Sequence, residues 1–150
     1  MGFTLIELLV VMVIMGFLTT LGVSTFRSSQ VKGRDAQRKH DLTQIQSALE
    51  MYLNDKSRYP AAAVGIPDGG SAWQDANGTL YMKLVPSDPL GENYCYETGS
   101  GNEDGVWYKL YGKLENEKDL MITKTCPPPA GCSCDSDDAF NIKVTSPNAP

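Results

Sequence analysis

The N-terminal 26 residues constrain the fold of this chain more than any other feature. Glu7 is the only charged side chain between Met1 and Arg27, and the residues around it are apolar or small. From Leu8 to Phe26 there are 19 uncharged residues. As a helix they would span roughly 28 Å, close to the thickness of a hydrocarbon core. This pattern predicts a membrane-spanning helix over residues 3–26.

The carboxylate of Glu7 has a large energetic cost in such a helix. On insertion scales an acidic residue at the centre of a bilayer helix costs roughly 2.5–3.5 kcal/mol, and a plain anchor gains nothing from it. Glu7 is therefore a candidate functional residue that needs a charged partner. The alternative is that its side chain snorkels to the interface near the chain end. A signal peptide is disfavoured, because the apolar run is long and no Lys or Arg precedes it.

Charge is distributed unevenly after the apolar segment. Residues 27–40 hold five basic residues against one acidic residue, a net charge of +4, whereas residues 41–150 hold 8 Lys and Arg against 16 Asp and Glu. The acidic part argues against nucleic acid as its partner. The short basic band beside an apolar segment instead indicates contact with lipid headgroups or with a neighbouring subunit.

Residues 27–59 are predicted to continue the helix as an amphipathic segment. There is no Gly or Pro from Arg34 to Asn54, and Pro60 disfavours helix at Tyr59. Apolar side chains recur at helical spacing and form one stripe, whereas Asp41, Gln44, Glu50 and Asn54 fall largely elsewhere. The stripe consists of Leu42, Ile45, Leu49, Tyr52 and Leu53. A helix from about residue 4 to 54 would form a spine with an apolar first half and a second half packed under a head. Gly16 and Gly22 in its apolar half suit either close helix packing or local unwinding.

Residues 60–150 are predicted to form this head. A Gly-, Pro- and Ala-rich connection runs to about Gly78, and five short strand-like runs follow. The expected fold class is α+β, with a small twisted antiparallel sheet of three or four strands packed on the helix stripe. The runs are Leu80–Val85, Tyr94–Thr98, Val106–Leu114, Leu120–Lys124 and Phe140–Val144. The third alternates Val106, Tyr108 and Leu110 against Lys109, Tyr111 and Lys113, as in a strand with one buried face.

The cysteines indicate an oxidising compartment. Their even number in a small head beyond a membrane segment predicts disulfide bonds, with free thiols as the alternative. The four are Cys95, Cys126, Cys132 and Cys134. Because Cys132 and Cys134 are poorly spaced for bridging each other, Cys95 is expected to bond to one tail cysteine and the other two to each other. A zinc site is disfavoured by the lack of a Cys-x₂-Cys pair.

The string Gly2-Phe3-Thr4-Leu5-Ile6-Glu7-Leu8-Leu9-Val10-Val11 resembles the processing site of type IV pilins and of the pseudopilins of type II secretion. The resemblance implies that a prepilin peptidase cuts between Gly2 and Phe3 and methylates the new amine of Phe3. It also implies that Glu7 of one subunit neutralises the Phe3 amine of its neighbour. Residues 1–2 would be the leader remnant; leaders in this family usually carry Lys or Arg, so this one is unusually short or begins upstream.

Two further stretches are similar to this family. One is the helix that ends in Arg58-Tyr59-Pro60, and the other is the turn Asp88-Pro89-Leu90-Gly91 leading to Tyr94, as in major pseudopilins and short bacterial pilins. The resemblance also raises the expectation of calcium in the C-terminal loop, where Asp135, Asp137 and Asp138 lie near Ser136 and Asn141 and cluster the oxygens that hard cations prefer. A solvated acidic tail is the alternative.

These observations favour a structural protein and not an enzyme. The only histidine, His40, lies on the basic helix, no nucleophile–base pair can be argued, and no glycine loop could cradle phosphate. The resemblance implies a filament subunit, inserted once in the cytoplasmic membrane with its head outside and then extracted into a cell-surface polymer. Its partners would be itself, minor pilins, the prepilin peptidase and the assembly platform.

The membrane orientation is the point on which the patterns disagree. The positive-inside rule would place the residues after the basic band in the cytoplasm, whereas the resemblance and the cysteines place them outside, and we follow the latter two. A type IV pilin is the favoured interpretation, because a cysteine-rich tail is more usual there. The alternatives are a major pseudopilin with a calcium-binding head, a membrane-tethered binding module that does not polymerise, and a secreted enzyme with its signal removed.

Overall fold

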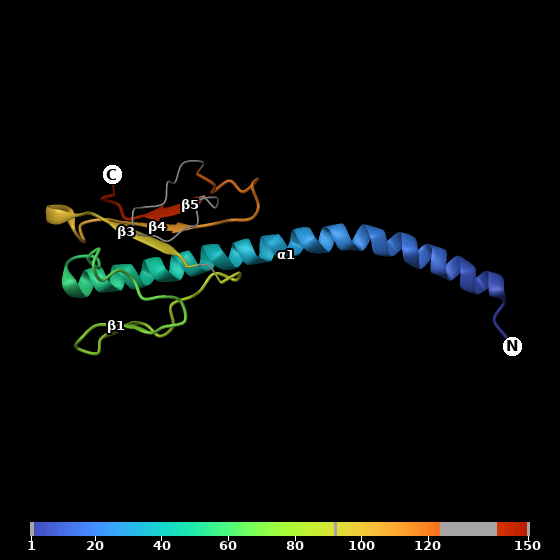
Figure 1. Cartoon of the computed structure of the whole chain (residues 1–150), viewed down its shortest axis with the longest axis horizontal. Helices are drawn as coiled ribbons and strands as arrows, with labels where there is room; N and C mark the ends of the chain where they lie inside the picture. Colours follow the sequence, from blue (N-terminus) through green and yellow to red (C-terminus); the bar gives the residue numbers. More distant parts are fainter. Residues whose placement is uncertain (1, 92, 124–140, 150) are drawn as a thin grey trace.

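The computed structural model describes residues 2–91, 93–123 and 141–149. One helix, α1 (Leu5–Lys56), forms a spine whose second half carries a small head, while its first half extends away from the head (Figure 1). The head contains five short strands and one 3₁₀ turn, η1 (Gly101–Glu103). The strands are β1 (Trp73–Gln74), β2 (Leu80–Met82), β3 (Cys95–Thr98), β4 (Tyr108–Gly112) and β5 (Ile142–Thr145). The predicted α+β class is confirmed.

The ends of α1 are set by local chemistry. Thr4 is the N-cap and shares a capping box with Glu7, the arrangement that satisfies free backbone N–H groups at a helix start. At the other end Ser57 adopts a left-handed conformation, with φ of 58°, and its N–H donates to the Leu53 carbonyl at 2.7 Å. The helix is continuous through Gly16 and Gly22, without local unwinding.

The main sheet packs on one side of the spine. It is antiparallel in the order β3-β4-β5, and Leu110 of β4 pairs with Tyr96 on one side and Val144 on the other. Its helix-facing side meets the predicted apolar stripe, because Leu42, Ile45 and Leu49 are each at most 1% exposed. The core between sheet and helix is completed by Ala48, Tyr59, Tyr108, Leu110, Leu114 and Ile142.

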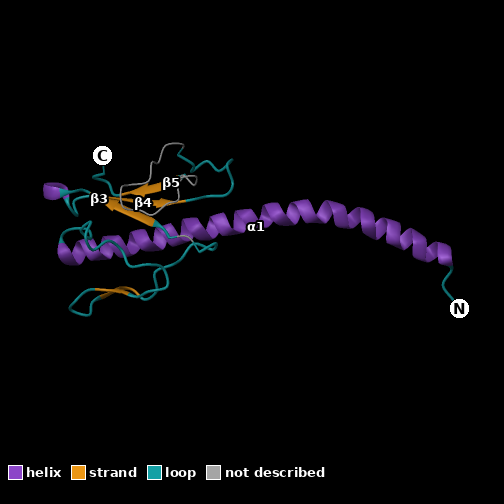
Figure 2. Ribbon diagram, in the orientation of Figure 1, coloured by secondary structure: helices purple, strands orange, loops and turns teal. Residues whose placement is uncertain are grey.

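A two-stranded hairpin of β1 and β2 lies on the other side of the same helix, as the orange segment below α1 in Figure 2 shows. Its aromatic side chains stack on the helix: the ring of Tyr52 lies 5.9 Å from Trp73 and 4.9 Å from Tyr81, between ring centroids. Aromatic pairs at such distances contribute beyond the apolar area they bury. The second half of α1 is therefore packed on two sides. The strand predicted at Leu80–Val85 is present as β2, but it pairs with β1 and does not join the main sheet.

Three details of the head differ from the predictions. The run that begins at Leu120 is not a strand over the residues described to Thr123; Asp119 instead caps a turn there through the Met121 N–H, and Leu120 is fully exposed. Val106 precedes β4 and is exposed. Tyr111, predicted on the open face of β4, is buried, and its hydroxyl donates to Glu97 of β3.

Candidate functional site

The predicted processing site lies just outside the helix. Residues 2–4 have no regular secondary structure, and the Phe3 side chain is 89% exposed. The Thr4 backbone N–H and hydroxyl each donate to Glu7 Oε2 at 2.8 Å, while the Glu7 N–H donates to the Thr4 hydroxyl at 3.4 Å. Glu7 thus lies in the first turn and is held by Thr4, while Gly2 and Phe3 precede the helix. The peptide bond between Gly2 and Phe3 lies on non-helical chain, where an enzyme could reach it.

The apolar half of α1 has no partner within the described chain. Its most apolar stretch of 18 residues has a mean hydropathy of 2.3, and none of these residues is buried. Leu5, Leu9 and Phe17 are 82%, 55% and 67% exposed. Such a continuous apolar surface marks a contact with lipid or with other protein chains. Residues 5–20 of this helix are therefore a candidate interaction surface.

The basic residues after the apolar half join the spine to the head. Arg38 is 2% exposed and forms a two-point ion pair with Asp88, with nitrogen–oxygen distances of 2.5 and 3.1 Å. Its third nitrogen donates to Asp35 at 2.9 Å and to Glu115 at 2.6 Å. Arg38 therefore ties the helix to the turn before β3 and to the loop after β4. A buried charge of this kind is tolerated only because each donor has a partner.

We call the ion pairs of Arg34 and Arg38 with Asp35, Asp88 and Glu115 the neck network. Its acidic members also hold backbone groups in place. Asp88 accepts the Leu90 N–H at 2.8 Å, so one carboxylate holds both Arg38 and its own turn, which closes on Gly91 with φ of 87°. The two Asp35 oxygens accept the N–H groups of Glu115 and Asn116, each at 2.9 Å. The neck network thus fixes the position of both loops on the helix.

Glu115 is the more exposed acid of the network. Its carboxylate accepts two hydrogen bonds from Arg34, at 2.8 and 2.5 Å, besides the one from Arg38. These hydrogen bonds, that of Arg34 first, lower the pKa of Glu115 to about 2. Glu115 therefore remains ionised across any physiological pH.

Besides Asp35 and Asp88, a third buried acid, Asp41, lies one turn beyond Arg38. It is 4% exposed, although its spacing placed it largely off the apolar stripe. Its carboxylate accepts a hydrogen bond from the Tyr94 hydroxyl at 2.9 Å. Burial raises the pKa of Asp41, and the Tyr94 hydrogen bond only partly opposes this effect.

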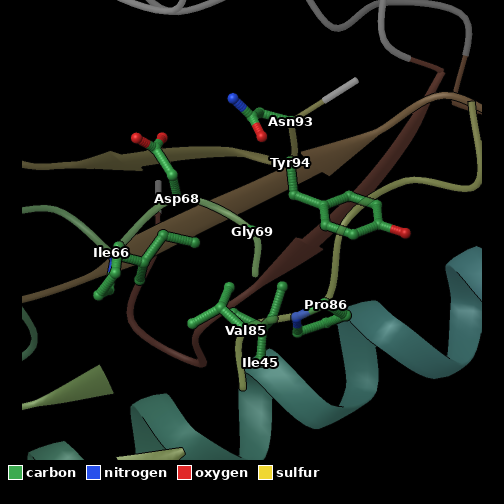
Figure 3. Close-up of a pocket in the computed structure, with 9 residues that line it drawn as sticks. Ile45, Ile66, Asp68, Gly69, Val85, Pro86, Asn93 and Tyr94 are labelled. Atoms are coloured by element: carbon green, nitrogen blue, oxygen red, sulfur yellow. The ribbon is translucent and has the colours of Figure 1, made fainter. Parts of the chain in front are cut away.

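A small cavity lies between the middle of the head and the spine (Figure 3). Ile45, Val85 and Pro86 line its apolar base, while Asp68 and Asn93 are exposed beside it. The Tyr94 hydroxyl points away from these two polar side chains in Figure 3. No nucleophile–base pair meets there, and among the described residues no group of three or more His, Cys, Asp or Glu could hold a metal ion.

The remaining predicted site residues divide into two groups. Cys95 is buried on β3 and disulfide-bonded. Cys126, Cys132 and Cys134 lie outside the described residues, so the pairing scheme stays a prediction. The same holds for the calcium candidates Asp135, Asp137 and Asp138. His40 is exposed on the helix, as expected for a solvated or subunit-facing position.

The neck network, which positions the head on the spine, is not predicted by the sequence. The signal was a basic band of +4 followed by an acidic head, together with the Asp88-Pro89 turn. Charge counts indicate that pairing occurs, but Arg38 and Glu115 are separated by 77 positions and nothing in the sequence specifies that they meet.

Two protein families match this chain, one over the N-terminal apolar segment and one over the rest of the helix and most of the head. Residues 2–23 match the prokaryotic N-terminal methylation motif, and residues 26–117 match the family described as type II secretion system (T2SS), protein G. Type II secretion system core protein G of Pseudomonas aeruginosa is 37% identical over 101 residues, covering 63% of this chain and 71% of that protein. The proteins of the same name from Klebsiella michiganensis and Vibrio cholerae are 35% and 33% identical, over 62% and 63% of this chain and 70% and 68% of their own lengths. No solved structure matches significantly. The chain belongs to the type II secretion system protein G family.

Proposed function

We propose that this chain is a major pseudopilin, the repeating subunit of the filament of a type II secretion system. The observation that carries the proposal is the match of residues 26–117 to the protein G family, next to a methylation motif at residues 2–23. The favoured interpretation from the sequence was a type IV pilin; the comparisons favour its alternative instead. The cysteine-rich tail favoured a pilin, but most of this tail lies outside the described residues.

Processing would create the charge that Glu7 needs. Cleavage between Gly2 and Phe3 leaves an ammonium group on Phe3, which is then methylated. In the described chain the Glu7 carboxylate is hydrogen-bonded only to Thr4 and meets no cation. In a filament it would pair with the Phe3 amine of a neighbouring subunit, since two opposite charges in an apolar bundle are tolerated only together. This contact would set the axial register between subunits.

The exposed apolar half of α1 would first anchor the subunit in the membrane and then pack against the same segment of other copies. Both environments remove the exposed side chains of residues 5–20 from water, which is the dominant driving force for such association. The head, held on the neck network, would lie on the outside of the filament. Other pseudopilins, a prepilin peptidase and an assembly platform are the partners we propose, and calcium remains a proposal for the C-terminal loop.

The processing step is tested by the intact mass of the mature protein isolated from membranes. We expect the loss of Met1 and Gly2 and the gain of one methyl group. A full-length mature chain, or one shortened by some 20 residues as a cleaved signal peptide would leave it, would contradict the proposal.

The role of Glu7 is tested by two substitutions that separate its two interactions. Glu7→Gln keeps a side chain that can accept the Thr4 N–H but removes the charge, whereas Glu7→Ala removes both. We expect both variants to insert in the membrane and both to fail in filament assembly and in secretion. Normal assembly by Glu7→Gln would show that Glu7 acts as a helix cap and not as a charge partner.

A further inference from the structure

The head neutralises only some of the cations in the basic band. Arg34 pairs with Glu115, and Lys39 donates to Asp119 at 2.6 Å. Arg38 is fully enclosed by acids of the neck network. Arg27 and Lys32, by contrast, are exposed and form no ion pair with any residue that the structure describes. The band is therefore divided into paired cations near the head and unpaired cations near the apolar segment.

A third unpaired cation comes from the head itself. The loop after β4, the orange segment in Figure 1, extends along α1 beyond the sheet toward the apolar half. Its residues 115–118 line a shared surface hollow with Ser28, Val31 and Lys32. Lys118 in this loop is exposed and has no ion pair among the described residues. The fold thus places Lys118 at the same height along the spine as Lys32.

That height corresponds to the headgroup layer of a membrane. Arg27 follows directly on Phe26, the last residue of the apolar segment. Lys32 lies about 7.5 Å further along the helix, and each headgroup layer of a bilayer is about 5–7.5 Å thick. Arg38 lies about 16 Å beyond Arg27, outside that layer, where head acids neutralise it. Within the basic band, the unpaired cations are those within reach of lipid phosphates.

We propose that Arg27, Lys32 and Lys118 form a surface that binds the anionic phospholipid headgroups of the head-side leaflet while the subunit waits in the membrane. The proposal rests on the proposed function in one respect, that α1 is membrane-inserted before assembly. Each cation near an anionic surface is expected to strengthen the attraction roughly fivefold. The exposed Glu117 in the same hollow opposes it. Leaving the membrane for the filament would require release of these lipids.

A second copy of the chain is the less favoured occupant. The acids nearest the neck are already engaged, since Asp35, Asp88, Glu115 and Asp119 all hold cations of their own chain. At the opposite end of the head, η1 carries the exposed Glu103. A second copy would thus have to bring a distant acid to these cations, whereas the cations directly follow the apolar segment of their own chain. Lipid is therefore the favoured occupant.

The test uses the full-length chain in nanodiscs of phosphatidylcholine with a minor fraction of phosphatidylglycerol. Electron spin resonance of spin-labelled phosphatidylglycerol and phosphatidylcholine gives their relative association with the protein. We expect phosphatidylglycerol to be preferred by the unmodified chain. Lys118→Gln should lower the preference roughly fivefold, and the triple substitution of Arg27, Lys32 and Lys118 by Gln should abolish it. Salt at about 1 M should also abolish it, because the screening length is then about 3 Å.

Two matched variants sharpen the result. Glu117→Gln removes an opposing charge and should raise the preference. Lys83→Gln removes an exposed lysine that has no ion pair among the described residues. Lys83 follows β2, away from the neck network, so this substitution should leave the lipid preference unchanged.

Equal association of the two lipids, or a preference that survives the triple substitution, would overturn the inference. So would a preference seen only in discs with several copies, since the cations would then bind between copies. A chain that does not enter the disc would contradict the proposed function itself.

Discussion

The two halves of α1 form one continuous helix, but the first half is exposed and apolar whereas the second half is packed against the head. In residues 5–26 the side chains that the structure describes are exposed, and the single charge is satisfied by its own helix cap. In residues 31–56 one face is buried between sheet and hairpin. Its buried charges pair with residues 50 to 81 positions away, in addition to the pair between Asp35 and Arg38. The difference teaches that the second half finds its partners within one chain, whereas the first half exposes an apolar surface that no described residue covers.

The largest effect on the head is expected from Arg38→Ala. It leaves the carboxylates of Asp35 and Asp88 buried without their cation, and breaking a buried pair in this way costs about 3–5 kcal/mol. The free energy of unfolding of the full-length chain in detergent micelles can be measured by tryptophan fluorescence, because both tryptophans, Trp73 and Trp107, are buried in the head. Arg27→Ala is the control and should change it by less than about 0.5 kcal/mol. A cost below about 1 kcal/mol for Arg38→Ala would show that the neck network does not hold the head.

The comparison of the halves is tested most simply by one substitution made in each. Leu49→Ala opens a cavity in the core and should lower the free energy of unfolding by about 2–5 kcal/mol, since Leu49 is fully buried. Leu9→Ala should leave the stability of the head unchanged, because Leu9 touches no part of it. The same fluorescence measurement serves both variants. A similar loss in both would mean that the apolar half contributes to the head after all.

Acidic pH should weaken the neck through Glu115. The folded-state pKa of about 2 lies below the ordinary value of 4.5. The stability it provides is therefore fully present above pH 4.5 and is lost as the pH falls from 4.5 toward 2. Glu115→Gln should reduce the slope of stability against pH in that window, by at most about 1.4 kcal/mol per pH unit. Glu117→Gln, its exposed neighbour, should leave the slope unchanged; equal slopes for all three proteins would contradict the pairing with Arg34.

The smallest effect is expected at Asp41, and its sign is opposite. Because burial raises its folded-state pKa, the ionised form weakens the fold above the ordinary pKa of Asp, and this penalty disappears in acid. Asp41→Asn keeps an acceptor for the Tyr94 hydroxyl and should raise the stability at pH 7 but not at pH 3. Tyr94→Phe removes the donor and should lower the stability at pH 7. A loss of stability for Asp41→Asn at pH 7 would reverse this assignment.

The sequence predicts well what depends on local pattern. The helix, the stripe of Leu42, Ile45 and Leu49, and strands β3 and β4 follow from periodicity and turn residues, which act over a few positions. The capping box at Thr4 and Glu7 has the Thr-x-x-Glu spacing of a helix start. The same residues carried the family resemblance.

What the sequence could not specify depends on pairing between distant segments. Strand β2 lies within the predicted run Leu80–Val85, but its partner β1 lies where a loop was expected. The two short strands are held by stacking on Tyr52 and not by a long alternating pattern. The run after Asp119 is apolar enough for a strand, yet hydrogen bonds of Asp119 and its ion pair with Lys39 shape it into a turn. Asp41 is buried and accepts a hydrogen bond from Tyr94, a contact between distant residues that helical spacing does not reveal.

The central claim is that the apolar half of α1 is completed by other copies of the chain. A photo-reactive amino acid placed at Leu9, which is 55% exposed, tests this in cells that actively secrete. The account predicts covalent dimers and higher oligomers through Leu9 when the secretion system is assembled, and adducts with lipid alone when assembly is blocked by Glu7→Ala. Adducts with lipid alone in both strains, with secretion intact, would contradict it.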